Sequence, residues 1–199
     1  ADISAFAHIN PKRPDSEYPY RELCGAGVIY KLSVALLDTL PNEIHPEWHK
    51  WFLDMVAIAT LSDMVPLVGE NRVLAKYGLK VLRKTRRPGL CAIFNEKRIN
   101  QRELTEDDVV FSITPLINAA SRMDKPELAL NLLKSKNSDE AKKFVKELRK
   151  LNDARKGAVA SIVKDVKKHL ENHEGEIAVI VRGDPSWQPS LLGLAAQSL

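Results

Sequence analysis

Apolar residues recur along most of this chain at spacings of three and four, which is the spacing of amphipathic helices. Prolines suited to a first helical position, or able to end a helix, bound several of these stretches. The pattern predicts helices over residues 28–40, 46–65, 70–84, 105–114 and 126–133. Thr105 and Asp108 form a capping-box pair at the start of the fourth helix, and we expect Pro115 to end it.

The longest periodic stretch follows Asn137, which together with Glu140 predicts a capped helix that continues to about Glu171. Such a helix would span roughly 50 Å at 1.5 Å per residue. Gly157 lies near its middle, where glycine costs about 1 kcal/mol relative to alanine and favours a bend. Because this length exceeds that of most domain cores, we expect a rod that joins two bodies.

Two stretches have the pattern of strands, residues 3–9 and residues 176–181, in which five apolar residues follow a glutamate. The expected fold is therefore a helix-rich α/β chain. We expect one domain over residues 1–136, a connecting helix over 137–174, and the start of a second α/β domain over 175–199.

Residues 54–67 form an apolar segment, apart from Asp54 at its entrance and two hydroxyls, and the carboxylate of Asp63 lies near its end. An ionised carboxylate among apolar neighbours is costly unless a cation, a metal ion or several donors compensate it. Asp63 is therefore a candidate metal ligand. The alternative is that Asp63 faces water at the helix end or caps the next turn.

The composition is that of an ordinary soluble protein, with 44% apolar and 28% charged residues in 199. Cys24 and Cys91 are expected to be buried thiols in a reducing compartment. No leader segment and no apolar run near 18 residues is present, which predicts a cytoplasmic location and no membrane association. The cluster of Trp48, Trp51 and Phe52 is expected to belong to the core rather than to a stacking platform.

The net charge of +4 is unevenly distributed. Between residues 72 and 102 the only acidic residue is Glu96, whereas the basic residues are Arg72, Lys76, Lys80, Arg83, Lys84, Arg86, Arg87, Lys97, Arg98 and Arg102. Such a patch suits a polyanion, although a solvated helix face is the commoner reason for one. By itself it favours nucleic acid only weakly.

Several motifs occur in a fixed order along nearly the whole chain: Asn-Pro at 10–11, LCGAGV at 23–28, AIATLSDMVPL at 57–67, GENR at 69–72, INAASRMD at 117–124, LNxxR at 151–155 and WxxxxxGLAA at 187–196. The series resembles the RecJ family of single-strand-specific 5′→3′ DNA exonucleases, in the DHH phosphoesterase superfamily. The resemblance implies a DHH domain that holds two Mn²⁺ or Mg²⁺ ions, followed by a DHH-associated domain.

By this resemblance Asp63 would be a metal ligand and catalytic residue. Asn118 and Arg122 would contact the substrate, and the basic helix that begins near Arg72 would guide the strand. The alternative for Arg122 is a structural arginine that bridges Asp124 or a helix C-terminus. The implied partners are single-stranded DNA and, beyond it, a single-strand-binding protein and a helicase.

The chain also departs from the family pattern. The Asp-His-His motif is expected upstream of Asn10, and the DHH-associated domain is cut short, so we expect these 199 residues to be a fragment with little activity alone. Leu116 stands where an arginine is typical, and Gln188 where a histidine is common. His169 and His173 have a spacing that can bind zinc, but a solvated helix end explains them better.

Two rival functions remain. One is a DHH phosphoesterase that acts on short oligonucleotides or cyclic dinucleotides, which the long helix and the 117–124 motif oppose. The other is a non-catalytic, DHH-fold nucleic-acid-binding or replisome scaffold protein.

Overall fold

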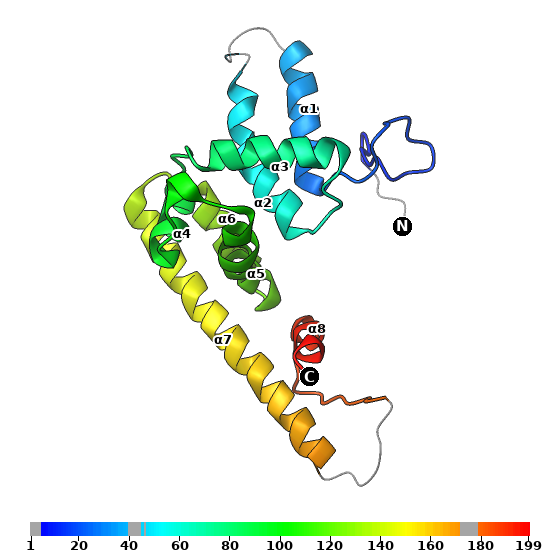
Figure 1. The fold of residues 1–199 in the computed structure, drawn as a ribbon, viewed down its shortest axis with the longest axis vertical. Coiled ribbons are helices and arrows are strands. Elements are labelled where there is room, and N and C mark those ends of the chain that lie inside the picture. The colour runs from blue at the N-terminus through cyan, green and yellow to red at the C-terminus, as the bar shows by residue number, and fades with distance from the viewer. Residues whose placement is uncertain (1–4, 40–44, 46, 172–178) are drawn as a thin grey trace. The chain divides into compact units, whose positions relative to one another are not determined.

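The computed structural model describes residues 5–39, 45, 47–171 and 179–199 (Figure 1). The chain forms two compact units. One comprises the residues up to 86 together with 93–114, and the other comprises 87–92 together with 115–199. Within the described ranges every regular element is a helix, so the helix-rich prediction is confirmed. The domain boundaries expected at 136 and 174 stay predictions.

Helix α2 (Leu53–Ser62) is the centre of the first unit. Seven of its ten residues are buried, as expected for a helix that is apolar on most sides. The elements that contact it are α1 (Gly25–Thr39), the 3₁₀ turn η1 (Trp48–Phe52), α3 (Gly69–Leu82) and the π-helical turn η3 (Asp108–Ile113). Between α3 and η3 the chain forms α4 (Pro88–Lys97) and the short 3₁₀ turn η2 (Gln101–Glu103).

Gly78 lets α2 and α3 approach each other closely. A Cβ atom at this position would lie 2.4 Å from the carbonyl oxygen of Leu53 and 2.5 Å from Cβ of Ala57. Both helices bury apolar side chains at this contact, including Val56 and Leu74, which are 2% and 7% exposed. Removing this surface from water is the main stabilisation that the contact provides.

The second unit is organised along α7 (Ser138–Glu171), whose 34 residues confirm the predicted long helix. Two shorter helices contact α7, α6 (Pro126–Lys134) and α8 (Pro189–Gln197), while α5 (Thr114–Arg122) precedes them in the chain (Figure 1). Ile162 of α7 packs with Leu191 and Ala195 of α8 in a core that Trp187 borders. Gly157 is exposed and continues the helix.

Both predicted helix caps are present. The backbone N–H of Thr105 donates to Oδ2 of Asp108 over 2.9 Å, and the N–H of Asp108 donates back to Oγ1 of Thr105 over 3.4 Å. The N–H of Glu140 donates to Oδ1 of Asn137 over 2.9 Å. These bonds satisfy amides that have no partner within their own helices.

The prediction that Pro115 ends a helix is wrong. The chain stays helical from residue 106 to Arg122 because η3 precedes the proline. In η3 the N–H of Thr114 donates to the carbonyl of Val109, five residues back. Before Pro115 the backbone N–H groups bond to carbonyls five residues back, and after it they bond to carbonyls four residues back. Pro115 lacks an N–H and lies at this change, so no regular α-helical hydrogen bond is lost there.

The sequence pattern also missed α4. Pro88 begins this helix, at a first helical position to which proline is suited. Gly89 is needed because a Cβ atom there would lie 2.1 Å from the carbonyl oxygen of Leu132.

Neither predicted strand is seen in the described parts. Residues 5–9 have no regular structure and neither do 179–181, while residues 3–4 and 176–178 lie outside the described ranges. No helix in the described part of the chain is long and apolar enough to cross a membrane.

Two glycine substitutions test the close contact of α2 and α3. Gly78→Ala is expected to lower the free energy of unfolding by about 2 kcal/mol or more, because its methyl group collides with backbone. Gly157→Ala, with nothing within 4 Å, is expected to raise it by about 0.5–1 kcal/mol. Urea unfolding followed by circular dichroism measures both, and an equal effect of the two substitutions would contradict the packing described.

Candidate metal and nucleic-acid site

Asp63 does not lie among apolar neighbours. It is the C-terminal cap of α2, its backbone N–H donates to the carbonyl of Ala59 over 2.9 Å, and its side chain is exposed. The next residue, Met64, has a left-handed φ of 52°, and Pro66 disfavours helical geometry just before it, so the helix stops here. The expectation that Asp63 is a buried charge is therefore wrong, and the open alternative of a carboxylate at the helix end describes its position.

The buried carboxylate of this segment is Asp54, which is 1% exposed. The hydroxyl of Thr85 donates to its Oδ2 over 2.8 Å, and the backbone N–H of Met55 donates to its Oδ1 over 2.7 Å. Asp54 also lies in the first turn of α2, where the helix dipole favours negative charge. A helical projection could have separated the two acids, because nine residues at 100° each place Asp63 about 180° from Asp54.

The loop that follows Asp63 is held at two points. Asn71 of α3 is fully buried, and its Nδ2 donates to the carbonyls of Glu22 and Pro66 over 2.7 and 3.1 Å. The hydroxyl of Tyr20 donates to the carbonyl of Val68 over 2.7 Å. Gly69 has a left-handed φ of 53°, and a Cβ atom there would lie 2.9 Å from the Tyr20 ring. The GENR motif therefore holds the loop that carries Asp63, a role that sequence reasoning did not find.

A polar cluster ties the N-terminal segment to the start of α3. The hydroxyl of Tyr18 bonds both carboxylate oxygens of Glu70, at 3.0 and 2.8 Å, and Nζ of Lys31 lies 3.2 Å from Glu70. Burial, and then the bond to Glu70, raise the pKa of Tyr18. Burial opposes the charged form of Lys31, but its interactions with Glu70 and Tyr18 outweigh this and raise the pKa of Lys31.

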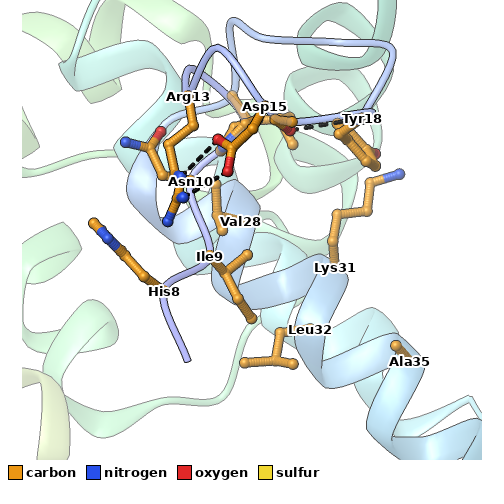
Figure 2. Close-up of a pocket in the computed structure, with 13 residues that line it drawn as sticks. His8, Ile9, Asn10, Arg13, Asp15, Tyr18, Val28, Lys31, Leu32 and Ala35 are labelled. Carbon is orange, nitrogen blue, oxygen red and sulfur yellow. Dashed lines mark hydrogen bonds and ion pairs between the residues drawn. The ribbon is translucent and has the colours of Figure 1, made fainter. Parts of the chain in front are cut away.

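Beside this cluster the N-terminal loop and α1 line an open pocket of about 540 Å³ (Figure 2). Asn10 shapes the loop, since its side chain accepts the N–H of Lys12 over 2.9 Å. Arg13 forms a two-point ion pair with Asp15 at 2.8 and 2.6 Å, which lowers the pKa of that carboxyl. Ile9, Val28 and Leu32 give the pocket an apolar wall.

The surroundings of Asp63 meet part of what a divalent cation needs. Exposed carboxylate oxygens suit a hard ion such as Mn²⁺ or Mg²⁺, and the carbonyl ends of α2 add negative potential that a cation would offset. However, no group of three or more His, Cys, Asp and Glu able to hold a metal occurs among the described residues. Asp63 fits as one ligand, and the described residues do not complete a two-ion site.

In the second unit, Arg122 at the end of α5 is tied to the start of α8. Its Nη1 donates to the carbonyl of Ser190 over 2.9 Å, and the Ser190 hydroxyl donates back to the carbonyl of Arg122 over 2.7 Å. Nε2 of Gln188 donates to Oδ2 of Asp124 over 2.7 Å. Arg122 thus bridges a neighbouring helix start rather than Asp124.

A second arginine of this unit, Arg155, lies within electrostatic range of Arg122. Its Nε and Nη2 donate to Oδ1 of Asn152 over 3.3 and 3.1 Å. Burial, and then the charge of Arg122, lower the pKa of Arg155. These bonds give a structural reason for the LNxxR motif.

The remaining predicted site residues are placed as follows. Arg72 is exposed on α3 of the first unit, and Asn118 is exposed on α5, one turn before Arg122. Leu116 is fully buried, so the leucine at this position serves the core. The structure does not test the roles of Asp63, Arg72, Asn118 and Arg122, which stay predictions.

Other side chains that the sequence singled out have structural or surface positions. Cys24 is buried, Cys91 is half-buried with its pKa raised by burial, and neither forms a disulfide. His169 is exposed in the last turn of α7, while His173 lies outside the described residues. Trp48, Trp51 and Phe52 are 53%, 44% and 38% exposed, so the expectation that they belong to the core is wrong.

An exposed carboxylate at a helix end, followed by a basic helix, is what the described residues offer to a cation and to a polyanion, and they do not form a metal site by themselves. The chain is 35% identical over 198 residues to the single-stranded-DNA-specific exonuclease RecJ of Bacillus subtilis. The matched region covers all of this chain and 24% of that protein. No family model matches the chain.

Solved structures point to the same proteins. The structure of RecJ from Thermus thermophilus in complex with Mn²⁺ matches 93% of this chain with a TM-score of 0.77 at 32% identity, and its Mg²⁺ complex matches 94% with a TM-score of 0.76 at 30% identity. The chain covers 26% and 28% of those two chains. The whole chain is therefore homologous to a segment of RecJ, and it spans about a quarter of these relatives.

The two acids of residues 54–67 are expected to respond differently to substitution. Asp54→Ala should lower the free energy of unfolding by about 1–3 kcal/mol, because it removes a buried, hydrogen-bonded carboxylate. Asp63→Ala should leave it almost unchanged, because its side chain is exposed. Urea unfolding curves of the two variants measure this difference, and a large loss of stability in Asp63→Ala would show that Asp63 is structural.

Proposed function

We propose that this chain is a segment of a single-stranded-DNA-specific 5′→3′ exonuclease that hydrolyses phosphodiester bonds with divalent metal ions. The observation that carries the proposal is the match of 93% of the chain, at a TM-score of 0.77, to a RecJ structure in complex with Mn²⁺. The proposal includes a role in DNA repair and recombination and a cytoplasmic location, where the chromosome of a bacterial relative lies.

In this proposal Asp63 supplies one oxygen ligand to Mn²⁺ or Mg²⁺, and residues in other motifs of the complete exonuclease supply the others. Bound ions would activate a water molecule and stabilise the leaving oxygen of the phosphodiester. The chain's own contribution is to present the carboxylate in solvent, at a helix end, on a loop fixed by Asn71 and Tyr20. An exposed position allows the carboxylate to meet both an ion and a substrate phosphate.

The proposed contacts to the DNA strand are Arg122, Asn118 and Arg72. The guanidinium of Arg122 has five N–H donors, and the bond to Ser190 orients it while leaving donors for a phosphate. Asn118 lies on the same side of α5, four residues earlier, where its amide could bond the same strand. Exposed Arg72 adds positive potential at the start of α3.

A single-strand-binding protein and a helicase are proposed as further partners, because exonuclease action needs exposed single strands. The second candidate function, a non-catalytic nucleic-acid-binding or replisome scaffold protein, shares the fold and the strand contacts. It differs in needing no metal ligand at Asp63, which makes the two separable by experiment.

The test is to exchange the matching segment of Bacillus subtilis RecJ for these 199 residues and to assay Mn²⁺-dependent release of mononucleotides from 5′-labelled single strands. The exchanged enzyme is expected to hydrolyse DNA, and the 199 residues alone are expected to show little or no hydrolysis, because one carboxylate does not hold two ions. Asp63→Asn in the exchanged enzyme should lower kcat at least about 100-fold, more than the loss of a group that only orients a ligand.

Asp38→Asn, which removes an exposed carboxylate of α1, is the matched control and should leave kcat unchanged. Full activity of the Asp63→Asn enzyme would contradict the ligand assignment. Robust, metal-dependent hydrolysis by the 199 residues alone would show that the site lies elsewhere in the chain. An exchanged protein that folds and binds single strands but never hydrolyses them would favour the scaffold function.

A further inference from the structure

The surface between η1 and α3 carries a groove of about 610 Å³. Its floor is apolar, since Leu53 and Leu74 belong to the core of the first unit and Val81 packs against them. The rings of Trp51 and Tyr77 line it and are 44% and 49% exposed. The volume falls within the range of about 300–1,000 Å³ that small-molecule sites have.

Local geometry explains why these rings are not in the core. In a 3₁₀ turn three residues complete a turn, so Trp48 and Trp51 of η1 share one side of it. The core below is filled instead by Leu53 and Val56, at the start of α2. The indole of Trp51 therefore stays at the surface, beside the groove.

The groove is positively charged. Lys50, Lys80 and Lys84 line it, and Glu47, the one carboxylate among its described lining residues, is paired with Lys50. Nζ of Lys80 lies 5.0 Å from the centroid of the Tyr77 ring, close enough for a cation–π interaction. The amine of Lys80 is thus placed directly over an aromatic side chain that lines the groove.

The adjoining surface of α3 extends this charge. Lys76 and Arg72 are exposed on the same helix, while its acidic residue, Glu70, is engaged by Tyr18 and Lys31. Arg83 is less available to a ligand than these residues, because its Nε donates to the carbonyl of Leu104 over 2.7 Å. The lysines and Arg72 give α3 an outward face whose charge suits a polyanion.

We propose that this groove binds a segment of single-stranded nucleic acid, with an unstacked base against Trp51 or Tyr77 and the phosphates near Lys80 and Lys84. Exposed aromatic rings beside lysines are how proteins hold single strands without reading their sequence. A duplex offers no unstacked base to the rings. The inference rests on the proposed function, because it adds a second contact for the same polymer.

The groove and Asp63 lie at opposite ends of α2. Leu53, on the groove floor, starts the helix, and Asp63 follows its last residue. Ten helical residues separate them by about 15 Å. A strand held by the groove would therefore be anchored at a distance set by one buried and rigid helix.

The test is fluorescence anisotropy of a labelled oligothymidylate of about ten nucleotides with the 199-residue chain in EDTA, so that no metal ion or hydrolysis contributes. Trp51→Ala and Tyr77→Ala are each expected to raise Kd about 5- to 100-fold, and Tyr77→Phe, which keeps the ring, to leave Kd within about twofold. Lys80→Ala with Lys84→Ala should reduce the slope of log Kd against log salt by about 1–2.

Phe111→Ala is the matched ring control, because Phe111 is 73% exposed in the same unit and does not line the groove. Lys143→Ala on α7 is the matched charge control. Circular dichroism confirms that each variant is folded. Equal Kd values for Trp51→Ala, Tyr77→Ala and Phe111→Ala, or no binding by the unsubstituted chain, would overturn the proposal.

Other occupants would give other results. If Trp51→Ala or Tyr77→Ala abolishes self-association in sedimentation but leaves the Kd for the oligothymidylate unchanged, the groove binds a second copy of the chain. This result would overturn the proposal. Failure of the exchanged exonuclease while the groove variants still weaken binding would reject the proposed function and keep the groove. If the exchanged enzyme is active but the groove variants bind DNA as tightly as the unsubstituted chain, the proposed function is kept and the groove proposal is rejected.

Discussion

The packing of α2 against α3 is the constraint on which the first unit depends. Gly78 allows backbone to approach within a distance that no side chain would permit, and the buried faces of both helices meet there. Because α2 is held on several sides, its two ends are fixed as well. One end places Leu53 under the aromatic groove, and the other places Asp63 in solvent.

Features set by nearby residues could be predicted from the sequence. The capping pairs at Thr105 and Asn137 and the long helix α7 agree with the structure, because helix caps and apolar periodicity are local effects. The continuation through Pro115 could not be predicted in this way. It depends on a five-residue hydrogen bond from Thr114, which no propensity of single residues indicates.

In the candidate site too, features set by nearby residues could be predicted from the sequence, and features set by distant contacts could not. The apolar character of residues 54–67 correctly indicates a buried carboxylate, but burial depends on contacts with the rest of the fold. Asp54, which Thr85 bonds, is 1% exposed, whereas Asp63 lies exposed at the helix end. Trp51 was misplaced for a related reason, since a 3₁₀ turn changes the direction of each side chain relative to an α-helix. Asn71 and Tyr20 matter only through contacts with loops distant in sequence, so only coordinates reveal them.

The exposure of Asp63 changes the physical basis of its proposed role. A buried carboxylate would need a cation for its own stability, whereas an exposed one does not, so the argument from burial applies to Asp54, whose charge Thr85 and a backbone amide already bond. What favours Asp63 is access: it is fixed at a helix end, on a loop that Asn71 and Tyr20 hold, where an ion and a phosphate can both reach it. The bonds from Asn71 and Tyr20 hold the loop that follows Asp63, while the side chain of Asp63 is exposed. The proposed ligand role would need both properties, because a ligand must be rigid and accessible.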